Sequence, residues 1–153
     1  AAYLALQGMG VKDVILIEPN PTRRDYLTNQ LSMDARTETN EMAPLIVDAV
    51  GYSVTRATAS ALAAPGGVIV HIGLGEDAGG LDIRRMTLQE ITFIGTYTYT
   101  AQDFRDTAKA MFDGRLGPLD WTETRPLSEG AQAFADLRNG AVATPKIILD
   151  PWG

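Results

Sequence analysis

The sequence has no cysteine and only one histidine, His71, among 153 residues. Without thiols the chain can form no disulfide and no thiolate metal site, which fits a reducing compartment such as the cytoplasm. No apolar run approaches the roughly 20 residues of a membrane helix. The opening segment AAYLALQ lacks the basic start of a signal peptide. Positive charge is also scarce, and the net charge of −6 argues against nucleic acid or an anionic membrane as the main partner.

What remains is ordinary for one globular domain, with 45% apolar and 21% charged residues. Two early glycines, Gly8 and Gly10, stand beside an apolar strand that ends in an acid, Glu18. A dinucleotide-binding fingerprint needs a strand, then glycines, then a helix, with the acid about 20 residues further on. Here the glycines follow a helical stretch and precede the strand. We therefore expect Gly8 and Gly10 to end a helix.

The rest of the chain alternates between apolar β-branched runs and helical segments. This alternation predicts an α/β fold with a Rossmann-like, doubly wound parallel sheet, incomplete at its N-terminus because the first strand and the glycine fingerprint are missing. Helices are expected after the capping residues Asn20, Ser53 and Thr100, with Phe104, Ala108, Met111 and Phe112 facing inward on the helix 101–112, and again over 128–138. Strands are expected at 14–17, 45–50, 68–74, 91–99 and 146–149.

Parallel sheets of this kind bind ligands beyond the carboxyl ends of their strands. Four expected strand ends therefore carry the candidate residues. Glycine at three of them lets a planar ligand approach the backbone closely, although glycines also simply terminate strands. The four ends are Glu18, Val50-Gly51, Ile72-Gly73-Leu74 and Gly95-Thr96-Tyr97.

The ordered series of segments resembles the cofactor-binding and C-terminal portion of the medium-chain, zinc-type alcohol and polyol dehydrogenases. GGVIVHIGL followed by QEITFIGTY is its most telling part, and the resemblance covers nearly the whole chain. The segments, in order, are VILIEPNPTRR, VDAVG, APGGVIVHIGL, QEITFIGTYTYT, RPLSEGAQAFADLRNG and PKIIL.

This resemblance implies a cofactor site. An acid at the end of the second Rossmann strand binds the adenosine ribose hydroxyls and repels a 2′-phosphate, so Glu18 favours NAD over NADP. Arg23 matches a basic residue that touches the ribose, whereas Arg24 is read as surface charge. By resemblance, Val50 and Gly51 would lie along the adenosine and nicotinamide-ribose side of the cofactor. Backbone groups of Ile72, Gly73 and Leu74 would face the nicotinamide carboxamide, and those of Thr96 and Tyr97 would flank the ring.

No catalytic or metal-ligating residue is expected in this chain. Asp48 stands inside an apolar run and His71 inside a strand, so both are read as structural. In the family a separate N-terminal domain holds the zinc, and the chain is expected to be a fragment of a longer dehydrogenase. We expect a truncated dinucleotide-binding domain over 1–99 and C-terminal helices and strands over 100–153.

The function implied is NAD-dependent hydride transfer between a small alcohol or polyol and nicotinamide. A zinc-free NAD(P)H quinone or enone reductase of the same superfamily is the alternative enzyme, and a non-catalytic nucleotide-binding or oligomerisation module is the third hypothesis. The strand Ile91–Gly95 is expected at the sheet edge, where it would pair with a second copy in a homodimer.

The segment between the expected third strand, 33–38, and Leu45 is too short for the usual crossover helix. Either this protein has lost that helix, or residues are omitted between Ala35 and Pro44. The sequence leaves both explanations open.

We predict that the isolated 153-residue chain oxidises no alcohol and binds NAD weakly, because it lacks a metal-ligand set and the helix N-terminus that meets the pyrophosphate. Calorimetry with NAD, and an alcohol oxidation assay with added zinc, check both parts. Micromolar NAD affinity or zinc-dependent turnover by this chain alone would contradict the prediction.

Overall fold

The computed structural model describes residues 1–153. Apart from the first two residues, it divides into two compact units, one made of residues 3–39 and 107–153 and the other of residues 40–106. Its helices are α1 (Ala2–Gly8), α2 (Pro21–Leu31), α3 (Ser53–Leu62), α4 (Ile83–Leu88), α5 (Ala101–Phe112) and α6 (Gly130–Arg138), with a 3₁₀ turn at Leu127–Glu129. Its strands are β1 (Leu16–Ile17), β2 (Ala35–Arg36), β3 (Ala43–Asp48), β4 (Ala63–His71), β5 (Thr92–Gly95), β6 (Thr122–Pro126) and β7 (Lys146–Asp150).

Every strand pair is parallel, as expected, but the strands form three separate sheets: β1-β2, β3-β4-β5 and β6-β7. The Rossmann strand order is 3-2-1-4-5-6. Within its own unit, β2-β1 has the neighbour order of strands 3 and 2, and β3-β4-β5 has that of strands 4, 5 and 6.

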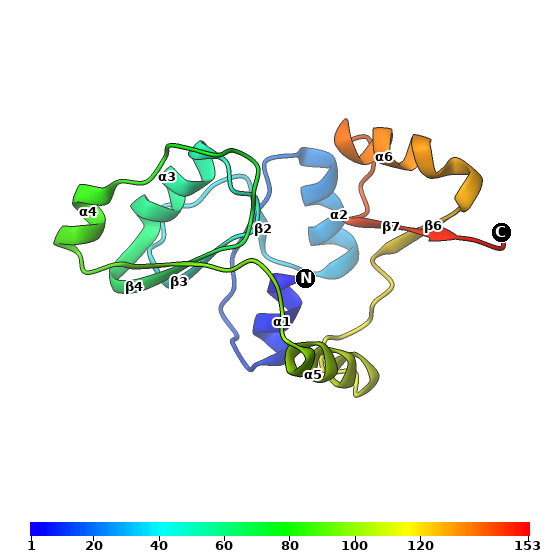
Figure 1. Ribbon diagram of the computed structural model, residues 1–153, viewed down its shortest axis with the longest axis horizontal. Helices are drawn as coiled ribbons and strands as arrows, with labels where there is room; N and C mark the ends of the chain where they lie inside the picture. Colours follow the sequence, from blue (N-terminus) through cyan, green and yellow to red (C-terminus); the bar gives the residue numbers. More distant parts are fainter. The chain divides into compact units, whose positions relative to one another are not determined.

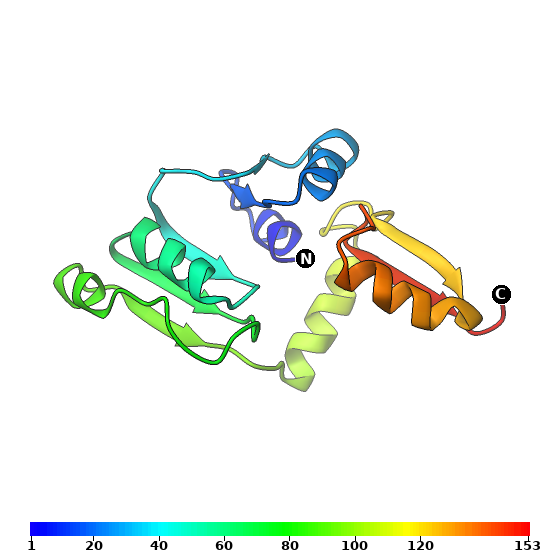
Figure 2. The same cartoon turned by 90° about the horizontal axis from the view of Figure 1, so that it is seen from above.

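The unit of residues 40–106 is a three-stranded sheet with α3 packed on one face (Figure 1 and, from above, Figure 2). Ile46, Ile69 and Phe93 lie in one row across the three strands. Ile69 is fully buried, and the α4 residue Met86 and the α3 residue Ala59 close the same core. The next row toward the carboxyl ends, on the same face, is Asp48, His71 and Gly95.

The strand positions were predicted better than their ends. The predicted strand 14–17 is reduced to Leu16–Ile17 because its partner β2 is equally short. The predicted strand 45–50 starts earlier and stops at Asp48, because the Asp48 carboxylate accepts the N–H groups of Val50 and Gly51. The predicted strand 68–74 is displaced in the same direction to Ala63–His71, and the predicted 91–99 shrinks to Thr92–Gly95 because β4 offers no partner beyond His71.

Helix ends follow the local chemistry. At the end of α1, the Gly10 N–H donates to the Gln7 carbonyl at 2.9 Å and the Val11 N–H to the Leu6 carbonyl at 3.0 Å, with Gly10 at φ +91°. This pair of bonds is a Schellman motif, so these glycines terminate a helix as predicted. Asn20 caps α2 by accepting from the Arg23 N–H, also as predicted.

Two helix predictions need correction. Ser53 is not a cap: Tyr52 holds that position, because the Thr55 hydroxyl accepts the Tyr52 N–H at 3.0 Å. The short helix α4 was missed, although Asp82 caps it by accepting from the Arg85 N–H at 2.8 Å.

The predicted inward face of α5 is wrong within this chain. Phe104 is 61% exposed and Phe112 92% exposed, and Met111 is also exposed, while Ala110 is the only buried residue of the helix. The apolar pattern identified the helix, but no part of the chain covers those side chains. Thr100 does cap the start of this helix as expected, and Asp103 completes a capping box with it.

The other unit joins α2 to the C-terminal β6-β7 ribbon and α6, which lies along that ribbon (Figure 2). Arg125 on β6 ties the ribbon to α6, since it donates to Glu123 at 2.6 Å and to Asp136 at 2.7 Å. Residues 37–42 connect β2 to β3 without a helix. No helix combines the length and apolar character needed to cross a membrane.

Candidate functional site: the carboxyl ends of the parallel strands

The nine predicted site residues fall into two groups, each inside one compact unit. Glu18 and Arg23 belong to the unit of residues 3–39 and 107–153. The other group belongs to the unit of residues 40–106 and follows β3, β4 and β5 directly: Val50, Gly51, Ile72, Gly73, Leu74, Thr96 and Tyr97.

Glu18 lies at the carboxyl end of β1, one residue past the strand, and its N–H still donates to the Arg36 carbonyl of β2 at 2.9 Å. The side chain is half-buried, and Oε1 accepts the Asn20 N–H at 2.9 Å. The second carboxylate oxygen has no partner in the chain. Glu18 is thus held in place through one oxygen, while the other is available to accept hydrogen bonds from a pair of hydroxyls.

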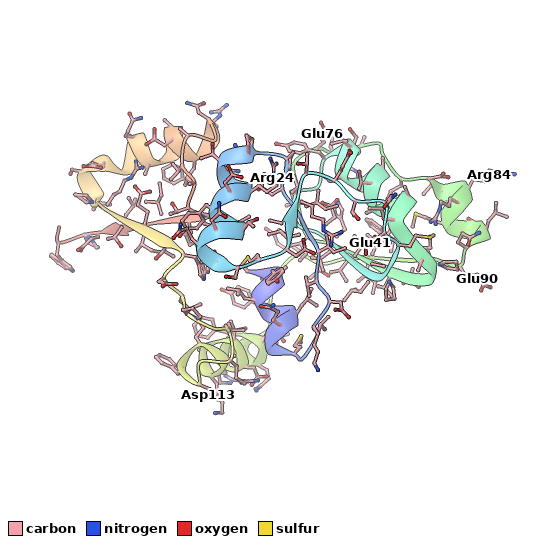
Figure 3. All side chains as sticks on the ribbon, turned by 180° about the vertical axis from the view of Figure 1, so that it is seen from behind. Arg24, Glu41, Glu76, Arg84, Glu90 and Asp113 are labelled. Carbon is pink, nitrogen blue, oxygen red and sulfur yellow. The ribbon has the colours of Figure 1, made fainter.

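The two arginines after Glu18 are both half-buried and both bind backbone carbonyls. Arg23 donates to the Leu137 carbonyl in the last turn of α6 at 3.1 Å. Arg24, labelled in Figure 3, donates to the Glu18 carbonyl at 3.0 Å and to the Pro19 carbonyl at 3.2 Å. Arg24 is therefore a structural support of the segment that carries Glu18, a role that its interpretation as surface charge missed.

In the other unit, Asp48 organises the strand ends. Its Oδ1 accepts the N–H groups of Val50 at 3.1 Å and Gly51 at 2.9 Å, and its Oδ2 accepts the Thr55 hydroxyl at 3.0 Å. Its own carbonyl accepts the N–H groups of Ile72 and Gly73. These bonds give the buried Asp48 carboxylate a structural role, since both of its oxygens hold neighbouring groups in place.

The glycines at these strand ends are needed for close packing between two loops. A Cβ on Gly51, which has φ +76°, would overlap the Gly73 carbonyl, and a Cβ on Gly73 would overlap the backbone of Val50. Gly95, in contrast, has open space where a side chain would stand. The two touching loops present several exposed apolar side chains at this edge of the sheet: Val50, Ile72 and Leu74.

Backbone groups remain for a ligand at the same edge. The Ile72 and Gly73 N–H groups are engaged by Asp48, and the Thr96 N–H donates to the His71 carbonyl at 2.9 Å. The carbonyl group of Ile72 accepts no hydrogen bond within the chain, whereas that of Gly73 lies against Gly51. An amide ligand could therefore donate to this segment.

His71 faces the core beside this edge. Its ring stacks at a tilt on Phe93 with centroids 5.2 Å apart, and Nε2 lies 3.6 Å from Asp48 Oδ2. Nε2 is buried and has no hydrogen-bond partner. The packing on Phe93 agrees with the reading of His71 as a structural residue.

Sequence reasoning missed Arg56, a 6% exposed residue on α3. Its guanidinium donates to the carbonyls of Gly51 at 2.8 Å, Glu76 at 3.1 Å and Gly79 at 2.6 Å, and also to the Ala78 carbonyl. A signal was present, since Arg56 is the only charged residue in the helix SVTRATASAL.

Glu76, labelled in Figure 3, belongs to the same loop and accepts the Ser53 N–H at 2.7 Å. The hydrogen bonds from Ser53, followed by the positive charge of Arg56, hold the pKa of the Glu76 carboxyl below its usual range. The carboxylate is therefore charged at neutral pH and caps the N-terminus of α3, where negative charge is favourable.

The chain does not fit a zinc ion. No group of three or more His, Cys, Asp or Glu side chains is gathered anywhere in it. With no cysteine and one histidine, the donor set of a catalytic zinc site is lacking.

A family model described as "Zinc-binding dehydrogenase" matches residues 1–113. The chain belongs to this family. The resemblance to medium-chain alcohol and polyol dehydrogenases is thereby confirmed, and with it the interpretation of the fold as a partial Rossmann domain. Among curated relatives, a probable D-xylulose reductase A of Aspergillus clavatus is 22% identical over 152 residues, covering 88% of this chain and 42% of the relative.

Two solved structures have the same fold. Acetophenone reductase from Geotrichum candidum, in complex with NAD, is 18% identical with a TM-score of 0.83, covering 97% of this chain and 44% of the other. YhdH of E. coli K-12, with bound NADPH, is 18% identical with a TM-score of 0.72, covering 95% of this chain and 49% of the other. This chain thus spans less than half the length of the curated relatives it matches.

The contact between the two loops predicts that Gly51→Ala destabilises the fold more than Gly66→Ala. Both glycines have positive φ, +76° and +71°, but a Cβ on Gly66 meets nothing within 4 Å. The control should lose about 1–2 kcal/mol from its left-handed backbone, and Gly51→Ala roughly 1–3 kcal/mol more from the overlap with Gly73. Urea unfolding of both variants measures the difference, and equal losses would show that the loops do not press on each other.

Proposed function

We propose that the chain is the cofactor-binding portion of an NAD-dependent alcohol or polyol dehydrogenase, which transfers hydride between a substrate alcohol carbon and nicotinamide. The observation that carries this proposal is Glu18, held at the carboxyl end of a parallel strand with one carboxylate oxygen free. A carboxylate there accepts hydrogen bonds from both adenosine ribose hydroxyls and repels the 2′-phosphate of NADP.

The residues after β3, β4 and β5 would bind the nicotinamide half. The exposed side chains of Val50, Ile72 and Leu74 supply an apolar surface for the ring. The carbonyl of Ile72 accepts from its carboxamide, and Thr96 and Tyr97 flank it through backbone atoms. Hydride transfer itself is the chemistry of the cofactor, while the protein supplies binding and orientation.

The remaining assignments follow the family. The dinucleotide-binding domain comprises 1–99, the segment 100–153 returns toward a catalytic domain, and Arg23 touches the ribose. Zinc, where the complete protein uses it, is held by residues outside this chain. The substrate is a small alcohol or polyol, supported by the relatives being dehydrogenases and reductases, and the protein acts in the cytoplasm.

The protein expressed from the complete coding sequence that contains this chain is expected to reduce NAD when supplied with polyols or simple alcohols. It is expected to lose this activity when a chelator removes zinc. Absorbance of the reduced cofactor follows the reaction. Quinone or enone reduction with NADPH, insensitive to chelators, would instead support the zinc-free reductase. Binding of NAD without any turnover would support the non-catalytic module.

In that protein, Glu18→Ala is expected to lower the ratio of kcat/KM with NAD to kcat/KM with NADP by about 10–150-fold, since removing one charge-assisted hydrogen-bonding group costs roughly 1.5–3 kcal/mol. Asp25→Asn is the matched control, because it removes an exposed acid from α2 without touching the end of β1. An unchanged ratio for Glu18→Ala would remove the basis for NAD preference.

The edge strand β5 supports a two-fold homodimer. It pairs only with β4, and Ile94 on it is 45% exposed. A free, apolar strand edge favours pairing with a second copy. Ile94→Lys is therefore expected to convert a dimer into a monomer in light scattering after size exclusion, whereas Ile83→Lys, on the exposed side of α4, is expected to leave the mass unchanged. A monomeric wild-type protein would reject the proposal.

A further inference from the structure

Arg56 is a buried cation that forms no close ion pair. Its hydrogen bonds go to four carbonyl oxygens, from Gly51 and from three residues of the loop 76–79, while its charge also acts on the Glu76 carboxylate. Since burying a guanidinium is costly unless its donors are satisfied, an arginine here implies that the position of those carbonyls matters.

The four carbonyls belong to two different strand ends. Gly51 follows β3, whereas Glu76, Ala78 and Gly79 belong to the loop after β4. Two backbone bonds join the same segments, from the Gly75 N–H to the Val50 carbonyl at 3.1 Å and from the Glu76 N–H to the Gly51 carbonyl at 2.9 Å. The Gly51 carbonyl thus accepts from both Glu76 and Arg56, and the guanidinium fixes the outer half of the loop to this junction.

The residues between β4 and this clamped loop are Ile72, Gly73 and Leu74. Asp48 fixes them at one end through the Ile72 and Gly73 N–H groups, and Arg56 fixes the chain again from Glu76 onward. Backbone bonds from Gly75 and Glu76 also hold the far end of this segment, and the Glu76 carboxylate binds the Ser53 N–H. Arg56 adds the hydrogen bonds that fix the loop from Glu76 to Gly79, so its loss would leave the exposed Leu74 and the Ile72 carbonyl less firmly directed.

We propose that Arg56 is a positioning residue for nicotinamide: it touches no ligand, but it holds the loop after β4 so that Ile72–Leu74 keeps the shape that receives the ring. This inference rests on the proposed function, because it assigns the ring to this segment. It goes beyond it by naming the residue that maintains the geometry, through a set of donors that only arginine can supply.

The test uses the protein expressed from the complete coding sequence with the substitution Arg56→Lys. Lysine keeps the positive charge but lacks the planar guanidinium group with its several N–H donors. Arg85→Lys is the matched control. Arg85 also donates to two backbone carbonyls, those of Ser60 at 2.6 Å and Ala63 at 3.0 Å, at the opposite end of β4. Arg56 makes four guanidinium–carbonyl bonds and Arg85 two, so the thermal unfolding of both variants measures how much stability each loses.

The decisive readout is the affinity for NAD against that for ADP-ribose, the same molecule without the nicotinamide ring. Arg56→Lys is expected to weaken NAD binding and to lower kcat by about 10–100-fold, the scale of a misplaced reactive group, while ADP-ribose affinity stays within about twofold, as for a surface change. Arg85→Lys is expected to change neither affinity.

If Arg56→Lys weakened the binding of NAD and of ADP-ribose equally, the inference would be overturned and Arg56 would be a general structural residue. Unchanged binding of both ligands would overturn it as well. Arg56→Gln, which retains part of the hydrogen bonding without charge, gives the same comparison if the lysine variant fails to fold. A wild-type protein that binds neither NAD nor ADP-ribose would reject the proposed function itself, a result distinct from either failure of the inference.

Discussion

The ligand-binding edge of the residue 40–106 unit depends on the hydrogen bonds of one buried residue, Asp48. Asp48 stops β3 by drawing the N–H groups of Val50 and Gly51 back to its side chain. Its carbonyl stops β4 by taking the N–H groups of Ile72 and Gly73. It also holds the first turn of α3 through Thr55. One residue therefore ends two strands at the same level and starts a helix, and the close contact between Gly51 and Gly73 follows from that alignment.

The sequence predicted the order of elements well because each signal was local. β-Branched runs marked the strands, Asn20 with Pro21 marked the start of α2, and Gly10 marked the end of α1. Strand ends could not be predicted in the same way, because they depend on hydrogen bonds between segments distant in the sequence, such as those from Ile72 and Gly73 to Asp48. The exposed face of α5 was mispredicted because an apolar stripe does not reveal whether its partner lies in the same chain.

For the site, the sequence identified the strand ends but not what holds them. Gly51 and Gly73 were predicted to let a ligand approach the backbone closely. The structure shows that each is also needed because a Cβ there would overlap the backbone of the facing loop. Arg24 and Arg56 were missed or read as surface charge, because arginine suggests a carboxylate or phosphate partner whereas here both bind carbonyl oxygens. Such partners carry no side-chain signature that a sequence could reveal.

The preference of arginine for carbonyls in this chain has a consequence for its response to solution conditions. Arg23, Arg24, Arg56 and Arg85 all donate to backbone oxygens. A peptide carbonyl does not titrate, and a guanidinium stays protonated throughout the physiological range. Mild acid breaks ordinary ion pairs by protonating their carboxylates, but it does not break these hydrogen bonds between guanidinium groups and backbone carbonyls.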